Sequence, residues 1–169
     1  MTSFSAKSKN NKHVSKLVVF VIYPNFVLLD LSGPLQVFTH VQSSENHQAA
    51  YETAIVSLEG GAIKSNTIAS IDSTPISEML GQSIHTLVVV GGDGAYEAMH
   101  DEKLIEAIEN LAASAGRVCS VCSGALILAA TGILDGRRAV THWEDCRQLA
   151  DEFPRIRVEV DPIFIKDGY

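Results

Sequence analysis

A cysteine that directly follows a short apolar run is the clearest candidate for chemistry in this chain. Val118 to Val121 predicts a buried strand, and Cys122-Ser123-Gly124 follows it without a spacer before an apolar helical segment. A strand that turns straight into a helix lifts the turn residue out of the sheet, as in the nucleophile elbow of hydrolases. The free amides of the helix N-terminus would favour a thiolate. We therefore expect a reactive thiol at Cys122, with a buried packing cysteine as the alternative.

The glycines after a neighbouring strand predict a partner for this thiol. Thr86 to Val90 is a β-rich run that Gly91-Gly92-Asp93-Gly94 ends. Ligands gather beyond the carboxyl ends of parallel strands, so the Gly92 amide is expected at the same edge of the sheet as Cys122. There it would donate to an oxyanion on a bound substrate. The alternative for Gly92 is a plain strand-to-helix turn.

The other cysteines argue against redox and metal chemistry. If residues 119 to 122 are extended, the Cα atoms of Cys119 and Cys122 lie on the order of 10 Å apart, whereas a disulfide needs less than about 7 Å. We expect Cys119 to be a small buried residue and Cys146 to be inert on the surface of a late helix. The odd count of three cysteines fits a reducing cytoplasm. No ligand spacing indicates a metal, and no motif indicates a cofactor.

Charge and hydropathy exclude two classes of partner. The chain carries 13 Lys+Arg against 20 Asp+Glu, a net charge of −7. The first sixteen residues contain lysines and no acid, so the remainder is more acidic still. Such a body repels a phosphate backbone, and DNA contact is expected only through a C-terminal module that this chain does not contain. No apolar run is long enough to span a bilayer, so no membrane contact is expected.

Buried strands that alternate with helices predict an α/β fold, a doubly wound and mainly parallel sheet with helices on both faces. Gly33-Pro34 is expected to interrupt the first helix. The expected strands are Leu17–Tyr23, Ala54–Leu58, one or two edge strands within Ile63–Ile71, Thr86–Val90 and Val118–Val121. The expected helices are Phe26–Val41, Ala95–Ala115, Ala125–Leu134 and Trp143–Phe153.

The two ends of the chain differ from this pattern. Residues 1–16 form a Ser/Asn/Lys stretch that predicts a disordered polar tail, or a targeting or nucleic-acid arm, ahead of a domain over 17–169. Near the other end, Arg157–Val160 and Ile163–Ile165 are strand-like, and Asp167-Gly168 predicts a hairpin turn. No returning strand follows it, so we expect the fold to be C-terminally incomplete, the alternative being a frayed terminus.

Several segments together resemble a known family. Val121-Cys122-Ser123-Gly124-Ala125 resembles the elbow of the ThiJ/PfpI superfamily, which has a flavodoxin-like, class I glutamine amidotransferase-like fold. From about Leu17 onward the chain looks most like the N-terminal domain of AraC-type, GlxA-like transcriptional regulators. The segments that carry this likeness are Leu29–Phe38, Val89–Gly94, Ser120–Trp143 and Asp161–Phe164.

The superfamily also contains isonitrile hydratase, a lyase, and this resemblance implies roles for individual residues. Cys122 falls at the position of its nucleophile, Ser123 at that of a neighbouring threonine, and Asp30 at that of the catalytic acid. Asp30 has an alternative role as a helix cap. PfpI-like proteases carry a histidine directly after the nucleophile, and Ser123 stands there instead, so proteolysis is not expected. His142 is expected to orient a turn rather than to complete a triad.

Two functions follow from the resemblance, and a third interpretation is a non-functional fragment. The first is a small-molecule-sensing and dimerisation domain of an AraC-type regulator, binding a small nitrogenous metabolite as a cytoplasmic homodimer. The second is a cysteine-dependent hydratase with Cys122 as nucleophile and Asp30 as acid and base. Cys122, Asp30, Ser123 and Gly92 would be catalytic residues in the enzyme and pocket residues in the sensor.

Overall fold

The computed structural model describes residues 15–42 and 48–168, and its centre is a six-stranded sheet. The strands lie in the order β3-β4-β2-β1-β5-β6, with β3 antiparallel to β4 and the other neighbours parallel. Their bounds are β1 Lys16–Val21, β2 Tyr51–Ser57, β3 Gly61–Lys64, β4 Ser70–Pro75, β5 Thr86–Val89 and β6 Val118–Ser120.

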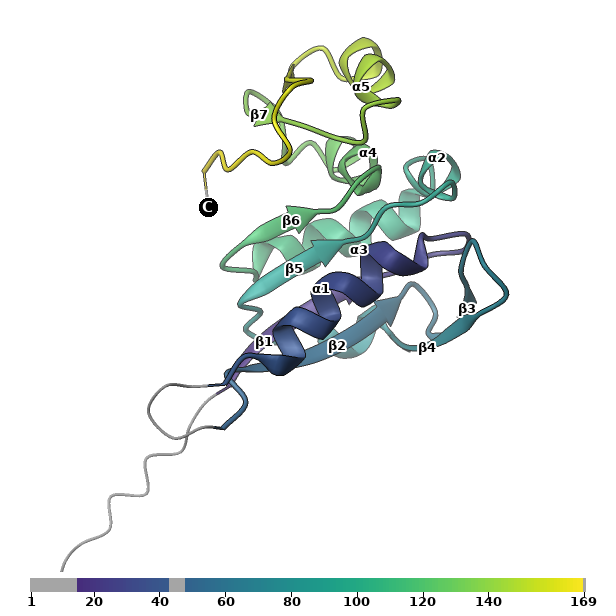
Figure 1. Cartoon of the computed structure of the whole chain (residues 1–169), viewed down its shortest axis with the longest axis vertical. Helices are drawn as coiled ribbons and strands as arrows, with labels where there is room; N and C mark the ends of the chain where they lie inside the picture. The colour runs from purple at the N-terminus through teal and green to yellow at the C-terminus, as the bar shows by residue number, and fades with distance from the viewer. Residues whose placement is uncertain (1–14, 43–47, 169) are drawn as a thin grey trace, which may run out of the picture.

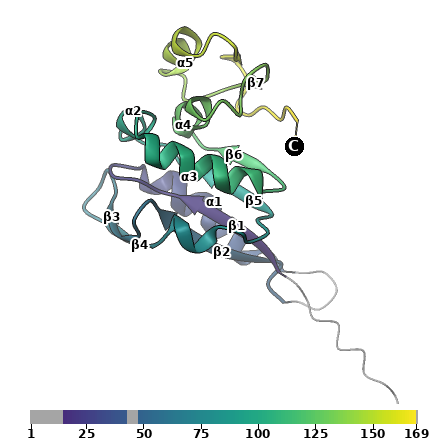
Figure 2. The same cartoon turned by 180° about the vertical axis from the view of Figure 1, so that it is seen from behind.

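Helices cover both faces of this sheet. Helix α1 (Leu28–His40) lies on one face and α3 (Glu102–Ala113) on the other, as the front and rear views show (Figures 1 and 2). The centre of the sheet is apolar on both sides because both faces are covered, and β1 is fully buried from Val18 to Val21. The expectation of an α/β fold with a doubly wound, mainly parallel sheet is confirmed.

A smaller group of elements lies beyond the end of β6, where the chain leaves the sheet (Figure 1). It consists of α4 (Gly124–Ala130), α5 (Cys146–Glu152) and the parallel pair β7 (Arg138–Ala139) and β8 (Arg157–Val158). Two short helices lie outside this group: η1 (Ile76–Met79) follows β4, and α2 (Ala95–Ala98) follows β5. The group beyond β6 covers the edge of the sheet at which the candidate residues were expected.

Two helix predictions were wrong in detail. Helix α1 continues through Pro34, because a proline removes only one hydrogen bond and Gly33 has no Cβ to clash with the proline ring. The helix expected over Ala95–Ala115 is instead two helices, α2 and α3. Asp101 separates them, since its carboxylate accepts hydrogen bonds from the amides of Lys103 and Leu104 and starts α3 anew.

Other differences concern the last third of the chain and its beginning. Cys146, expected on a surface, is buried with 4% exposure because its thiol packs against the turn that precedes α5. Ile163–Ile165 is not a strand, and the chain there is held instead by Asp167, which accepts a hydrogen bond from the Arg138 amide.

The predicted polar tail lies outside the described residues except for its last two positions, and β1 already begins at Lys16.

The cap at Asp101 gives a direct test of why α3 begins where it does. Asp101→Ala should lower the free energy of unfolding by about 1 kcal/mol, because two amides lose their acceptor. Asp101→Asn retains a capping oxygen and should stay close to the parent. Urea unfolding of the three proteins measures the difference, and equal losses for both variants would contradict this role of the side chain.

Candidate functional site

Cys122 lies on a sharp turn between β6 and α4, as expected. Its φ of 52° is in the left-handed region, a conformation that costs a non-glycine residue about 1–3 kcal/mol and occurs often at functional sites. Hydrogen bonds fix the turn on both sides: the Val121 amide donates to the Val89 carbonyl at 3.0 Å, and the Gly124 amide donates to the Val121 carbonyl at 3.0 Å. The strain is therefore imposed by the neighbouring strand and by the helix.

Asp30 approaches this turn from the first helical turn of α1. Gly91 makes the approach possible, because a methyl group at Gly91 would lie 2.7 Å from Asp30 Oδ2 and 2.7 Å from Cys122 Cβ. The Val27 amide donates to the Gly91 carbonyl at 2.8 Å and fixes the start of α1 against the same loop. The structure thus brings together Asp30 and Cys122, two residues that are far apart in the sequence.

The Asp30 carboxyl is partly withdrawn from solvent. Burial raises its pKa above the ordinary aspartate value, while the Cys122 thiol, the Gly91 amide and the charge of His142 act in the opposite direction. Its Oδ2 atom is buried and has no hydrogen bond of ordinary geometry within the described part of the chain. The raised pKa of Asp30 favours a carboxyl that holds a proton at a higher pH than a surface aspartate.

The Cys122 thiol has a raised pKa, which is opposite to what the helix N-terminus alone predicts. Burial is the largest cause; the Ser123 amide, the next largest, lowers the pKa by less than burial raises it, and the charge of Asp30 raises it further. The helix whose N-terminus points at the thiol, α4, is short, with seven residues. The thiol is therefore the favoured form at neutral pH, and the expectation of a thiolate was wrong because burial outweighs the nearby amides.

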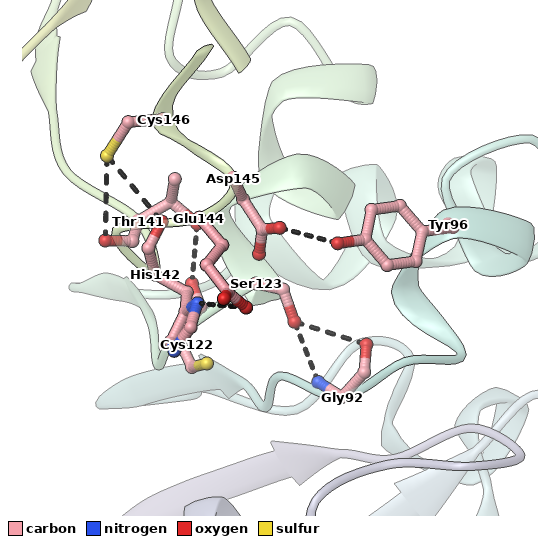
Figure 3. Close-up of polar contacts among 9 residues, drawn as sticks. All are labelled: Gly92, Tyr96, Cys122, Ser123, Thr141, His142, Glu144, Asp145 and Cys146. Atoms are coloured by element: carbon pink, nitrogen blue, oxygen red, sulfur yellow. Dashed lines mark hydrogen bonds and ion pairs between the residues drawn. The ribbon is translucent and has the colours of Figure 1, made fainter. Parts of the chain in front are cut away.

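Ser123 and Gly92 bind to each other rather than facing open space (Figure 3). The Gly92 amide donates to Ser123 Oγ at 2.8 Å, and Ser123 Oγ lies 3.1 Å from the Gly92 carbonyl, to which it donates. Ser123 is buried with 5% exposure. These bonds connect the Cys122 turn to the loop after β5, and they engage the amide that the sequence predicted as an oxyanion donor.

A turn formed by residues 141 to 146 lies over Cys122 (Figure 3). Thr141 Oγ1 donates to the Cys122 carbonyl at 3.0 Å, and the Asp145 amide donates to the His142 carbonyl at 2.9 Å. The His142 ring packs against Trp143 and lies 3.9 Å from Glu144. His142 thus belongs to a turn, as expected, and no described contact places it as a base on the thiol.

A cavity of about 380 Å³ opens beside the thiol. Its walls come from β6, from residues 137–142 and from residues 163–167, and they include Cys119, Cys122, Arg138, Thr141, His142 and Phe164. Asp30 is not part of its lining and reaches Cys122 from the α1 side. A second cavity, of about 340 Å³, lies over the ends of β1 and β2 and contains none of the predicted site residues.

The sequence did not indicate several residues that shape the site. Gly91 was noted only as the end of a strand, although it spaces Asp30 from Cys122. Tyr23 donates to the Val90 carbonyl at 2.8 Å, and burial, followed by the charges of Asp30 and Cys122, raises its pKa, so the phenol stays neutral. Tyr96 binds the buried Asp145. An isolated tyrosine or glycine has no sequence pattern that would show such contacts.

Two classes of feature are absent from the described residues. Over 15–42 and 48–168, no three His, Cys, Asp or Glu side chains gather in a way that would hold a metal ion. Within the same ranges, no helix has both the length and the hydrophobicity that crossing a membrane requires.

The chain belongs to the DJ-1/PfpI family, whose model matches residues 16–163. It is 39% identical over 137 residues to an uncharacterised protein encoded in the cpoL 5′ region of Streptomyces lividans, covering 81% of this chain and 94% of that protein. It is 33% identical to isonitrile hydratase of Pseudomonas putida, over 73% of this chain and 51% of the enzyme. It is 24% identical to the HTH-type transcriptional regulator GlxA of Rhizobium meliloti strain 1021, over 96% of this chain and 49% of the regulator.

Solved structures give the same fold. A ThiJ/PfpI family protein from Pseudomonas syringae superimposes with a TM-score of 0.79 at 25% identity, over 98% of this chain and 66% of that one. The resemblance to this superfamily and to GlxA-like regulators is therefore confirmed. The chain spans about half the length of both isonitrile hydratase and GlxA, and the family occurs in regulators and in an enzyme alike.

The contact between Asp30 and Cys122 predicts how the thiol titrates. Asp30→Asn removes a charge that raises the Cys122 pKa, so the thiolate fraction at pH 8 should increase about fivefold. The rate of Cys122 alkylation by iodoacetamide, followed by peptide mass spectrometry, measures this fraction.

Asp93→Asn is the matched control, because Asp93 is exposed and is not among the groups that shift the Cys122 pKa. It should leave the alkylation rate unchanged. Equal rates in the parent and in Asp30→Asn would show that the two side chains do not interact.

Proposed function

We propose that this chain is the small-molecule-sensing and dimerisation domain of an AraC-type transcriptional regulator. The observation that carries the proposal is a cavity of about 380 Å³ lined by a thiol with a raised pKa. A cavity of this size suits a small metabolite. A neutral thiol suits a pocket wall better than a nucleophile, because the thiolate is the attacking species.

Two further contacts favour sensing over catalysis. The Gly92 amide is hydrogen-bonded to Ser123, so an oxyanion would have to displace an existing bond to use it. The Asp30 carboxyl lies outside the cavity lining, with its Oδ2 atom buried. A proton donor would need to reach the substrate through the cavity, and Asp30 approaches from the other side of the thiol.

The ligand that we propose is a small nitrogenous metabolite, such as an amine or an amino acid. The cavity wall combines apolar residues with Thr141, His142 and four charged residues, which are Arg137, Arg138, Lys166 and Asp167. Apolar walls with a few placed polar groups are typical of pockets that orient small polar ligands. An amino acid can donate through its nitrogen to the Thr141 hydroxyl or to Asp167, and its carboxylate can accept from the arginines.

A ligand screen with a protection assay tests the proposal. Amines and amino acids are screened for an increase in Tm, since a ligand that binds only the folded chain stabilises it by mass action. The binding ligand should slow the alkylation of Cys122 by about tenfold when it is present at about ten times its Kd. A ligand that raises Tm and leaves Cys122 fully reactive would place binding elsewhere, and a screen in which nothing raises Tm would contradict sensing.

We further propose that the domain works as a cytoplasmic homodimer and contacts DNA only through a separate helix-turn-helix module. The net charge of −7 disfavours direct contact between this chain and DNA. Three free cysteines suit a reducing compartment. The outward side of α1 supports dimerisation, because Leu29 and Val37 are 73% and 64% exposed there.

Charge placed on α1 tests the dimer. The double variant Leu29→Lys/Val37→Lys should weaken self-association by about a hundredfold, because the interface would bury unpaired charges. Analytical ultracentrifugation gives the association constant. Leu80→Lys is the control, since Leu80 is exposed directly after η1, which packs against α3 on the other face of the sheet, and should leave the dimer intact. A monomeric parent, or a variant as dimeric as the parent, would contradict the proposal.

A second candidate is a cysteine-dependent hydratase, and the approach of Asp30 to Cys122 favours it. The thiolate would add to the carbon of an isonitrile, and water would then release the N-substituted formamide and regenerate the thiol, with Asp30 carrying the proton. Formamide production from a simple isonitrile, lost in Cys122→Ser, would establish the enzyme. A sensor forms no formamide and retains its ligand affinity in Cys122→Ser.

A further inference from the structure

A short hydrogen bond joins α2 to the turn over Cys122. The Tyr96 hydroxyl donates to Asp145 Oδ1 at 2.5 Å, across 49 positions of sequence (Figure 3). Asp145 is buried with 5% exposure, and the hydrogen bond is the first cause that raises the pKa of Tyr96 to about 12. A buried carboxylate needs such a donor, because an unpaired charge withdrawn from water is costly.

Asp145 in turn fixes the backbone of His142. The Asp145 amide donates to the His142 carbonyl at 2.9 Å, and the buried Cys146 thiol lies 3.5 Å from the same carbonyl, to which it donates. Thr141 attaches the turn that contains His142 to the Cys122 turn, because its hydroxyl donates to the Cys122 carbonyl. Two hydrogen bonds therefore hold the turn of residues 141 to 146: that of Thr141 to the Cys122 turn and that of Asp145 to Tyr96 of α2.

The side chain of His142 depends on this backbone for its position. Its own contacts are weak: a 3.9 Å approach to Glu144, which is 63% exposed at its side chain, and a tilted ring contact with the exposed Trp143. His142 nevertheless lines the cavity together with Cys122, and its charge acts on Asp30. A weakly held ring stays in one place only if its backbone is fixed.

We propose that the hydrogen bond between Tyr96 and Asp145 is a clasp that holds His142 in the wall of the Cys122 cavity. Tyr96 and Asp145 are positioning residues, because they act through His142 and do not line the cavity. The proposal rests on the proposed function only in taking this cavity as the ligand site. Its test uses the free chain without any ligand, so the clasp and the sensing function can fail separately.

The titration of Asp30 reports where His142 lies. In Tyr96→Phe the turn is released, His142 spends less time near Asp30, and the pH midpoint of Asp30 should rise by about half a pH unit. The midpoint is read from the carbon-13 NMR signal of the carboxyl, assigned with Asp30→Asn. His142→Gln should give a rise at least as large, because it removes the charge altogether. Tyr96→Phe should add nothing in that background, because Tyr96 acts only through His142.

Matched variants separate positioning from general stability. Asp145→Ala should reproduce the rise, whereas Asp145→Asn keeps an acceptor oxygen and should stay near the parent. Tyr51→Phe makes the same chemical change at the start of β2, where the ring packs against Phe38 and His85, and should leave the Asp30 midpoint unchanged.

Tyr96→Phe decides the test even if Asp145→Ala fails to fold, since it removes one oxygen from a ring that is 40% exposed. If the pH midpoint of the Asp30 titration is unchanged in Tyr96→Phe, the proposal that the hydrogen bond between Tyr96 and Asp145 holds His142 is wrong. A rise that persists, undiminished, when Tyr96→Phe is added to His142→Gln also contradicts it, because the effect would then not pass through His142.

Discussion

The left-handed backbone of Cys122 is the constraint on which the other features of the site depend. A non-glycine residue keeps such a conformation only where its neighbours leave no alternative, and here β5 fixes Val121 while the first turn of α4 fixes Gly124. Ser123 then binds Gly92, and Thr141 binds the Cys122 carbonyl. These contacts explain why one strained turn connects the loop after β5, helix α4 and the turn before α5.

The same constraint sets the electrostatics of the thiol. The turn holds Cys122 against the Asp30 carboxyl in a partly dry environment, where burial raises the pKa of both groups and the charge of Asp30 raises that of Cys122 further. Asp30 lies on one side of the thiol and the cavity on the other. A neutral thiol between a partly buried carboxyl and a cavity supports the proposal that this site recognises a ligand.

The sequence predicted the parts of the structure that have local signals. Continuous apolar runs located β1, β5 and β6, and the absence of a spacer after Val121 located the turn at Cys122. Asp30 was found through a family resemblance, since nothing local distinguishes it from a helix cap. The burial of Cys146, the break at Asp101 and the role of Gly91 depend on contacts between distant segments. The sign of the Cys122 pKa shift was missed because the sequence shows the helix but not the burial.

The ionisation of Cys122 tests the central claim most directly. The thiolate absorbs in the ultraviolet, so the difference in absorbance between the parent chain and Cys122→Ser, recorded across pH, gives the titration of this one group. The structure predicts a thiol that is neutral at pH 7 and ionises above the ordinary cysteine range, because burial and Asp30 both raise its pKa. Ionisation at or below neutral pH would contradict this account and would identify Cys122 as an activated nucleophile.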